Sequence, residues 1–196
     1  MTDKEKRDAG MLYNLDGSEE LGKEYAHAAE LVYQLNSLRL SATKEREAVM
    51  KSLFGSMGAR CRIISPFHCD YGYNIHIGEN LFANSGLVIL DTARVSIGSN
   101  VLIGPQVGIY AAYHPLDVST RIAGFEAAKP ITICDNVWIC GHVSILPGVT
   151  IGEGSVIGAG SVVTRDIPPG VVEAGNPCRI IKHIETDGTT LPLERC

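Results

Sequence analysis

Residues 131–163, ITICDNVWICGHVSILPGVTIGEGSVIGAGSVV, carry an aliphatic side chain at every sixth position. The repeated positions are Ile133, Ile139, Ile145, Ile151, Ile157 and Val163. An amphipathic helix repeats every 3.6 residues and a half-buried strand every two, so neither structure explains this period. A six-residue period rich in β-branched residues and glycine is typical of a β-helix, in which each hexad supplies one short strand and one corner.

The same phase extends upstream through Ile97, Ile103 and Ile109. A second aliphatic residue recurs four positions after many of the repeated ones, at Val101, Val107, Val137, Val143 and Val149. An earlier copy begins at Ile77, but it lies twenty residues before Ile97 and is therefore two residues out of phase. We expect a mainly β fold with a bulge or distorted turn between these two copies.

Between Ile109 and Ile133 the phase survives across 24 residues, but the intervening hexads do not match the pattern. Residues 111–128, AAYHPLDVSTRIAGFEAA, are therefore expected to form a loop that leaves one corner of the coil and returns in register. Long loops on a rigid scaffold usually serve function. His114 lies near the base of this loop, and Pro115 favours an extended backbone at the histidine.

The flanking segments differ from the repeat. Residues 18–37 are expected to form a helix with Ser18 as N-cap, and a second helix is expected over about 43–56. These helices can cover the open end of the coil. We divide the chain into a helical region at 1–58, a β-helix domain at 59–184 that ends in a short helix after Pro177, and a polar, poorly ordered tail at 185–196.

Composition narrows the function classes. The 196 residues are 45% hydrophobic and 20% charged, with a net charge of −5, which indicates a globular protein. There is no basic run that would favour nucleic acid or an anionic membrane. The N-terminus lacks an apolar signal-peptide core, and the apolar stretches are too short to span a bilayer. We expect a soluble cytoplasmic protein.

The six cysteines form no C-x-x-C pair, so nothing local supports a structural zinc site. Free buried thiols are the expected state. Cys134 and Cys140 follow repeated aliphatic positions, where glycine stands in other copies, and we interpret them as small residues that replace it.

The full pattern resembles the hexapeptide-repeat acyltransferases, and within them the maltose, galactoside and nodulation-type sugar O-acetyltransferases. The resemblance runs from about residue 5 to 184. It rests on GMLY (10–13), YGYNIHIG (71–78), FAN (82–84), His114-Pro115, PITI (130–133), NVWI (136–139), PGVTIG (147–152), VIGAGSVVT (156–164), DIPP (166–169) and AGNPCR (174–179). It implies a left-handed parallel β-helix, a homotrimer with active sites between subunits, acetyl-CoA as cosubstrate, and neither a tightly bound cofactor nor a metal.

His114 matches the catalytic histidine of that family. Acetyl transfer from a thioester to a sugar requires removal of a proton from a weakly acidic hydroxyl, and an imidazole that titrates near neutrality suits this task. The tetrahedral intermediate also needs hydrogen-bond donors aimed at its oxyanion. The resemblance places the backbone N–H near Gly141 beside the thioester. On sequence context alone, His114 is equally well explained as a surface-loop residue.

The resemblance assigns Asp16, Asp70, Phe82 and Asn84 to acceptor binding. Asn84 can instead be a simple corner residue, and Asp16 a turn residue. The chain departs from the family at Tyr25, where an arginine facing the acceptor is frequent, and at Asp70, where a smaller polar residue is common. These departures leave the identity of the sugar open.

The CoA side of the expected site is the second half of the coil. Trp138 can pack beside the pantetheine arm, and Ala159 permits close approach of the backbone. Cations after the last repeats can meet the CoA phosphates. For each cation the alternative is a solvated surface charge, and for Trp138 the alternative is plain core filling. The expected set is Trp138, Gly141, Ala159, Thr164, Arg165, Arg179 and Lys182.

Three other functions fit parts of the pattern. A zinc enzyme of the carbonic-anhydrase type on this fold needs converging histidines, but residues 115–141 contain no second one. A non-catalytic structural β-helix has no need to keep His114, Asn84 and the C-terminal cations together. Acetylation of an amino acid, a drug or an amine uses the same chemistry, but the N-terminal helical region and GMLY favour the sugar group.

Overall fold

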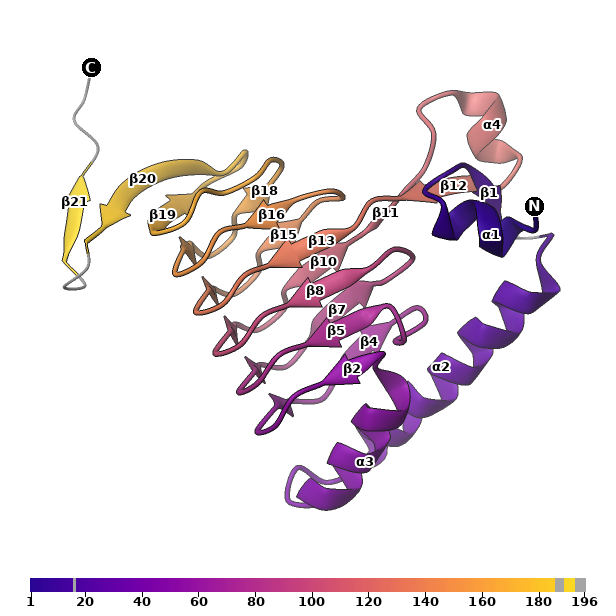
Figure 1. Cartoon of the computed structure of the whole chain (residues 1–196), viewed down its shortest axis with the longest axis horizontal. Coiled ribbons are helices and arrows are strands. Elements are labelled where there is room, and N and C mark those ends of the chain that lie inside the picture. The colour runs from indigo at the N-terminus through magenta and orange to yellow at the C-terminus, as the bar shows by residue number, and fades with distance from the viewer. Residues whose placement is uncertain (16, 186–188, 193–196) are drawn as a thin grey trace.

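The structure is a computed structural model that describes residues 1–15, 17–185 and 189–192. Its main body is a coil of short parallel strands stacked into three sheets, which form the three faces of a prism (Figure 1). The first face contains β2 (Ser56–Met57), β5 (Ile75–Ile77), β8 (Val95–Ile97), β13 (Ile131–Ile133) and β16 (Thr150–Ile151).

The other two faces follow in chain order. The second face contains β3 (Arg62–Ile63), β6 (Phe82–Ala83), β9 (Leu102–Ile103), β14 (Trp138–Ile139), β17 (Val156–Ile157) and β19 (Val171–Ala174). The third face contains β4 (Phe67–Cys69), β7 (Leu87–Leu90), β10 (Gly108–Tyr110), β15 (Ser144–Ile145) and β18 (Val162–Val163). The prism therefore has three edges, which we name after the two faces that each edge joins.

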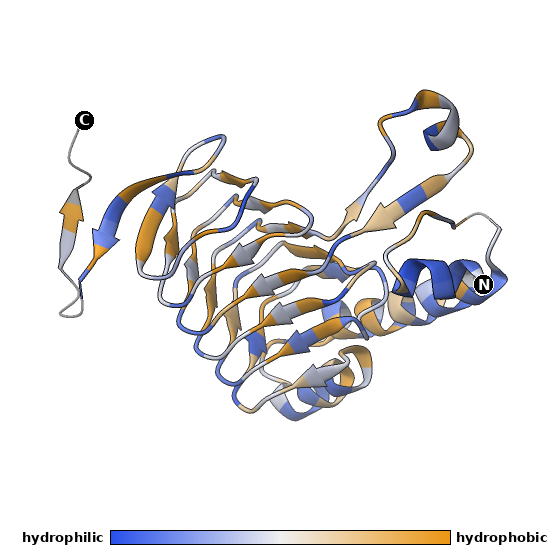
Figure 2. Cartoon of the chain, turned by 45° about the horizontal axis from the view of Figure 1, so that its top comes forward, coloured by the Kyte–Doolittle hydropathy of each residue, from blue (hydrophilic) through white to orange (hydrophobic). Residues whose placement is uncertain are grey.

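The hexad pattern corresponds directly to the core. All nine aliphatic residues from Ile97 to Val163 in the repeat point inward and are at most 3% exposed. Each stacks on its copy in the adjacent coil, as Ile139 does on Ile103 and Ile157. Burial of one such side chain contributes roughly 1.5–3 kcal/mol. Hydrophobic residues alternate with polar ones along the strands in Figure 2. The predicted parallel β-helix of hexapeptide repeats is confirmed.

The phase offset has a single structural origin. In the later coils, paired positions lie 18 residues apart, as for Trp138 and Val156, whereas Ile77 and Ile97 pair at a separation of 20. The two extra residues lie on the third–first edge, between Ile89 and Ile97. The predicted distorted turn is confirmed, and the coil departs from the hexad at this edge.

The long loop leaves the prism at the same edge and forms a protruding arm, defined here as residues 112–128 (Figure 1). The arm contains β11 (Ala112–Tyr113), the short helix α4 (Val118–Ile122) and β12 (Phe125–Ala128). A strand from the N-terminal region, β1 (Tyr13–Asn14), pairs with β12 and completes a three-stranded antiparallel sheet. The predicted excursion is confirmed, and its pairing with the N-terminus is an addition.

The N-terminal region contains α1 (Asp3–Asp8), α2 (Glu19–Ser37) and α3 (Thr43–Leu53). Ser18 caps α2 as predicted, and its Oγ accepts the Leu21 N–H at 3.3 Å. The second predicted helix is present but ends at Leu53, because the chain then enters β2. The helices α2 and α3 lie where the coil begins (Figure 1).

The C-terminal expectation was wrong. The residues after Pro177 form a strand, β20 (Arg179–Ile184), where a short helix was predicted. This strand pairs antiparallel with β19, and it carries three β-branched isoleucines that favour extended backbone. Within the tail that was predicted to be poorly ordered, β21 (Thr190–Pro192) pairs with β20, while residues 186–188 and 193–196 lie outside the described residues. In the described part of the chain, no helix has the length and apolar character needed to cross a membrane.

Candidate active site

The residues predicted for the active site lie on two different edges of the prism and on the face beside one of them. Asp70, the arm with His114, Thr164 and Arg165 follow strands of the third face and therefore lie on the third–first edge. Asn84, Gly141 and Ala159 follow strands of the second face and lie on the second–third edge, next to Phe82 and Trp138. The predicted site residues of one chain thus form two groups on opposite borders of its third face.

His114 follows β11 at the base of the arm and is exposed. Its Nδ1 lies 3.3 Å from the carbonyl oxygen of Phe125 on β12. Because a carbonyl can only accept, this bond requires the proton on Nδ1, which leaves Nε2 of the neutral ring as a free proton acceptor. The arm therefore holds His114 in the tautomer that a general base needs.

The remainder of the arm is braced by local contacts. Asp117 caps α4 and accepts from the Thr120 N–H at 2.8 Å, and hydrogen bonds from Thr120 and Ser119 lower the pKa of its carboxyl to about 2. Arg121 donates from Nη1 to the carbonyls of Pro115 and Leu116. These bonds fix the loop that follows His114.

Asp70 lies on the same edge, half-buried at the end of β4. Its backbone N–H donates to Oδ1 of Asp91 at 3.0 Å. Burial, followed by the negative charges of Asp91 and Glu126, raises the pKa of the Asp70 carboxyl to about 7. Asp91 is fully buried, and burial also raises the pKa of its carboxyl. Asp70 can therefore act near neutral pH as a hydrogen-bond donor or as an acceptor.

Sequence reasoning missed Glu126 and Tyr13 as parts of this group. Glu126 is on β12 and is 8% exposed, and its carboxylate accepts a hydrogen bond from the hydroxyl of the fully buried Tyr13 on β1. The N-terminal region thus anchors the arm beside Asp70. A charged residue near the end of the non-matching segment 111–128 was the available signal, but the partner Tyr13 lies more than 100 positions away.

An arginine and several tyrosines lie next to this acidic group, where the Tyr71 N–H donates to Oδ1 of Asp91. The guanidinium of the buried Arg7 lies 4.7 Å from the centre of the Tyr71 ring and donates to the hydroxyl of Tyr73 at 2.8 Å. Tyr25 on α2 is 41% exposed and packs edge-on against Tyr71, with ring centres 6.4 Å apart. Tyr25 therefore adds an exposed aromatic ring near Asp70.

On the second face, a row of outward-facing side chains runs along the prism. The strand register aligns Phe82 with Leu102, and Leu102 with Trp138. Trp138 is 50% exposed and Leu102 47% exposed, so Trp138 is not core filling. Lys182 on β20 continues the row beyond Val172. The result is an apolar strip with a cation at its C-terminal end.

The corners of the second–third edge, beside this strip, contain a polar side chain and a backbone N–H group. Asn84 accepts the N–H of Ser85 through its own Oδ1 at 2.8 Å, a contact typical of a corner residue. The N–H of Gly141 donates to no protein group in the described residues. A Cβ at Gly141 would lie 3.2 Å from the carbonyl oxygen of Pro105, so glycine keeps this corner tight.

The predicted CoA-binding residues at the C-terminal end are exposed. Ala159 lies in the turn between β17 and β18, and Arg165 follows β18. Arg179 donates from Nη1 to the carbonyl of Cys178 at 2.7 Å and retains further donors. Asp16, the remaining acceptor candidate, lies outside the described residues.

Metal and thiol chemistry gain no support from the arrangement. Within the described ranges, no group of three His, Cys, Asp or Glu side chains is placed to hold a metal ion. The five described cysteines are free thiols. Only Cys69 and Cys178 are buried, whereas Cys61, Cys134 and Cys140 are half-buried, which corrects the expectation that all are buried.

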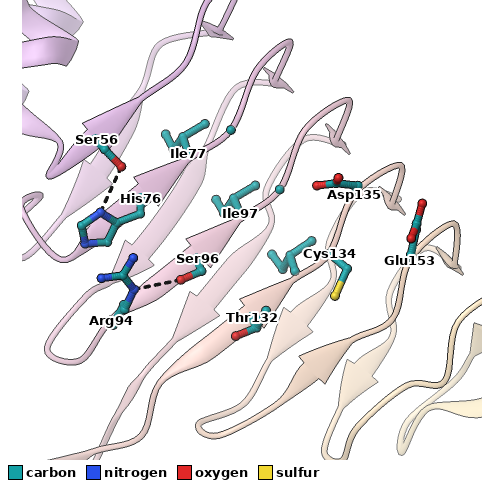
Figure 3. Close-up of a pocket in the computed structure, with 13 residues that line it drawn as sticks. Ser56, His76, Ile77, Arg94, Ser96, Ile97, Thr132, Cys134, Asp135 and Glu153 are labelled. Carbon is teal, nitrogen blue, oxygen red and sulfur yellow. Dashed lines mark hydrogen bonds between the residues drawn. The ribbon is translucent and has the colours of Figure 1, made fainter.

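A hollow of about 520 Å³ on the first face contains none of the predicted site residues (Figure 3).

Comparison with known proteins identifies the family. Residues 6–58 match a model described as the maltose acetyltransferase hexapeptide capping motif, and residues 130–165 match the bacterial transferase hexapeptide (six repeats). A putative acetyltransferase of Saccharomyces cerevisiae is 51% identical, over 92% of this chain and 93% of its own length. The chain belongs to the hexapeptide-repeat acetyltransferases.

Solved structures of this family agree over nearly the whole chain. A maltose O-acetyltransferase from Clostridium difficile 630 superposes with a TM-score of 0.92 and 49% identity, covering 94% of this chain and 98% of its own. A galactoside acetyltransferase in complex with coenzyme A gives a TM-score of 0.90 and 43% identity, covering 95% and 93%. The resemblance that the sequence motifs indicated is confirmed, and so is membership of an acetyltransferase family.

Proposed function

We propose that this acetyltransferase moves acetyl from acetyl-CoA to a hydroxyl of a sugar of the maltose, glucose or galactoside type. The observation that carries the proposal is the bond from His114 to the Phe125 carbonyl, which leaves Nε2 free to accept a proton. Similarity to a maltose O-acetyltransferase and to a galactoside acetyltransferase bound to coenzyme A supports the substrate class.

In the proposed reaction, Nε2 of His114 removes the proton of the sugar hydroxyl as its oxygen attacks the thioester carbonyl. A tetrahedral intermediate forms, and its oxyanion accepts a hydrogen bond from the free N–H of Gly141. Collapse breaks the carbon–sulfur bond, and protonated His114 returns the proton to the CoA sulfur. The products are the acetylated sugar and free CoA thiol.

This mechanism needs two copies of the chain. His114 and Asp70 lie on the third–first edge, whereas Gly141 and the Trp138 strip border the second–third edge. We propose a homotrimer in which the arm of one copy faces the strip of the next. Exposed apolar side chains on the arm, Leu116 at 95% and Ile122 at 79%, favour burial against another surface.

The acceptor half-site favours a polyhydroxylated ligand. Asp70, with the carboxylates of Asp91 and Glu126 nearby, offers hydrogen-bond acceptors for sugar hydroxyls, and Tyr25 supplies apolar surface beside it. Phe82, on the second face, contributes apolar surface from the facing copy. Negative charge at this end disfavours anionic acceptors. In the proposed CoA half-site, Arg179 and Lys182 at the end of the strip complement the phosphates of CoA, and Arg165 on the third–first edge does so from the facing copy.

The test is release of CoA thiol from acetyl-CoA across a panel of glucose, maltose, galactosides, amino sugars, serine and chloramphenicol. Release that requires a sugar and that is lost in His114→Ala supports the proposal. Absence of release with every acceptor, together with no binding of CoA by calorimetry, refutes it.

A complementation experiment tests the shared site. His114→Ala and Asn84→Ala change different edges of the prism, and each is expected to be inactive alone. Co-expression of the two variants restores some intact sites only if each site combines residues from two copies. Failure of a folded mixed oligomer to recover activity contradicts this arrangement.

A further inference from the structure

A hollow on the first face lies away from both groups of predicted site residues. It has a volume of about 520 Å³ and is lined by the outward side chains of β2, β5, β8 and β13 (Figure 3). None of the residues proposed for acetyl transfer contributes to it. Its lining therefore needs an explanation of its own.

The strand register makes this surface a row of hydrogen-bonding groups. Ser56 pairs with His76, His76 with Ser96, and Ser96 with Thr132. Neighbouring parallel strands lie about 4.8 Å apart, so the three hydroxyls and the imidazole follow one another at that spacing. Outward positions at this row carry no apolar side chain.

Arg94 supplies a positive charge without a carboxylate partner. Its Nε donates to Oγ of Ser96 at 3.1 Å. No ion pair to Arg94 occurs among the residues that the structure describes, so its terminal N–H groups remain available. A guanidinium with free N–H groups is the side chain best suited to bind an oxyanion at two points.

His76 lies beside Arg94 and is half-buried (Figure 3). Burial and the charge of Arg94 lower the pKa of its imidazole, so the ring is neutral at neutral pH. Its Nδ1 lies 3.0 Å from Oγ of Ser56. When Nδ1 accepts a hydrogen bond from the Ser56 hydroxyl, the proton of the neutral ring lies on Nε2, which is then a donor on a residue that lines the hollow.

The opposite side of the hollow is acidic. Asp135 and Glu153 lie on the first–second edge, where Asp135 accepts the Ser99 N–H at 2.7 Å and Glu153 accepts from the Asn136 amide at 3.1 Å. These bonds hold both carboxylates in place while leaving further acceptor positions. The hollow is thus polarised, with donors at Arg94 and acceptors opposite.

We propose that this hollow is a second ligand site, separate from acetyl transfer, for the phosphate group of a small polar molecule. Arg94, Ser96 and His76 donate to the phosphate, because a guanidinium, a hydroxyl and an imidazole N–H approaching from different directions match its three terminal oxygens better than the two of a carboxylate. A sugar attached to that phosphate donates its hydroxyls to Asp135 and Glu153.

The experiment is calorimetric titration of the full chain with inorganic phosphate, glucose 6-phosphate and glucose. Saturating CoA is present throughout, so that the proposed CoA half-site does not bind the probe. We expect one equivalent of phosphate or glucose 6-phosphate to bind, and glucose alone not to bind. Arg94→Gln weakens binding at least about tenfold, whereas Arg39→Gln, a control that removes one exposed charge elsewhere, leaves it unchanged.

Ser96→Ala is a milder second variant that retains the charge, and it is expected to weaken binding severalfold. In histidine-ring NMR spectra, the His76 signals shift with phosphate in the wild type and stay fixed in Arg94→Gln. Equal affinity in wild type and Arg94→Gln, or His76 signals that do not respond to phosphate, overturns the proposal.

Asp135→Asn distinguishes the two sources of phosphate. If it weakens glucose 6-phosphate but not inorganic phosphate, the site recognises a sugar phosphate. If both probes bind equally in both proteins, the ligand is the free ion. Because binding is measured directly, either result stands whether or not the chain acetylates a sugar.

Discussion

Replacement of His114 by alanine is the sharpest test of the proposed chemistry. The side chain is exposed, and its one hydrogen bond is the 3.3 Å contact to the Phe125 carbonyl. We therefore expect the free energy of unfolding to change by less than about 0.5 kcal/mol. Loss of a general base lowers the rate by about 10²–10⁴-fold, equivalent to roughly 3–5 kcal/mol of activation free energy.

The assay is initial-rate release of CoA thiol at saturating sugar and acetyl-CoA, with KM measured for both. The expected result is a large fall in kcat at nearly unchanged KM for acetyl-CoA, because the residues proposed to bind CoA lie on other elements. His27→Ala, an exposed histidine on α2, is the matched control and should behave as wild type. A His114→Ala enzyme that keeps more than about a tenth of its kcat would refute the general-base role.

Three further predictions concern stability and binding. The pKa of the Asp70 carboxyl rises from 3.8 to about 7 on folding, so the folded chain binds a proton that the unfolded chain has already lost. Wild type should therefore lose up to about 4 kcal/mol of unfolding free energy relative to Asp70→Asn as pH increases from 4 to 8. Urea unfolding of both proteins at both pH values measures this, and a stability difference between them that is the same at pH 4 and pH 8 would contradict it. Arg46→Met removes hydrogen bonds to the carbonyls of Leu35, Leu38 and Ile63 and should lower the free energy of unfolding by about 2–4 kcal/mol, whereas the exposed Lys44→Met should not. Ile139→Ala should lower the free energy of unfolding by about 2–5 kcal/mol, because it leaves a cavity in the core. Replacement of its exposed neighbour, Trp138→Ala, should raise KM for acetyl-CoA and leave stability nearly unchanged. A Trp138→Ala protein that is destabilised but keeps its KM for acetyl-CoA would place CoA binding elsewhere.

The hexad repeat made the coil predictable because each repeated aliphatic residue marks the inward position of one strand and the corner that follows it. Inward burial at Ile97, Ile133 and Ile151 follows from the period alone, without knowledge of distant partners. The same holds for the helix that Ser18 caps. The helix predicted after Pro177 failed, because β19 provides an unpaired edge to which residues 179–184 bind as a strand.

The candidate site was predictable only in part. His114 stands out because it lies where the repeat breaks, and that local signal is visible in the chain. Tyr13 and Asp91 carry no such signal, and Glu126, although it lies in the same interrupted segment, matters through its partner Tyr13, which is distant in sequence. The pKa of Asp70 is raised first by burial and then by the carboxylates of Asp91 and Glu126 on the same edge, and neither cause is visible in the sequence.

By itself, the sequence determined the period of the coil, the inward face of every hexad and the place where the repeat is interrupted, because these are properties of neighbouring residues. Only the tertiary structure decided that the interruptions share one edge, that β1 anchors the arm through Tyr13, and that the two groups of predicted site residues lie on opposite borders of the third face. The reason is geometric. A corner is specified locally, but which corners stack into one edge depends on how many residues each coil uses to close.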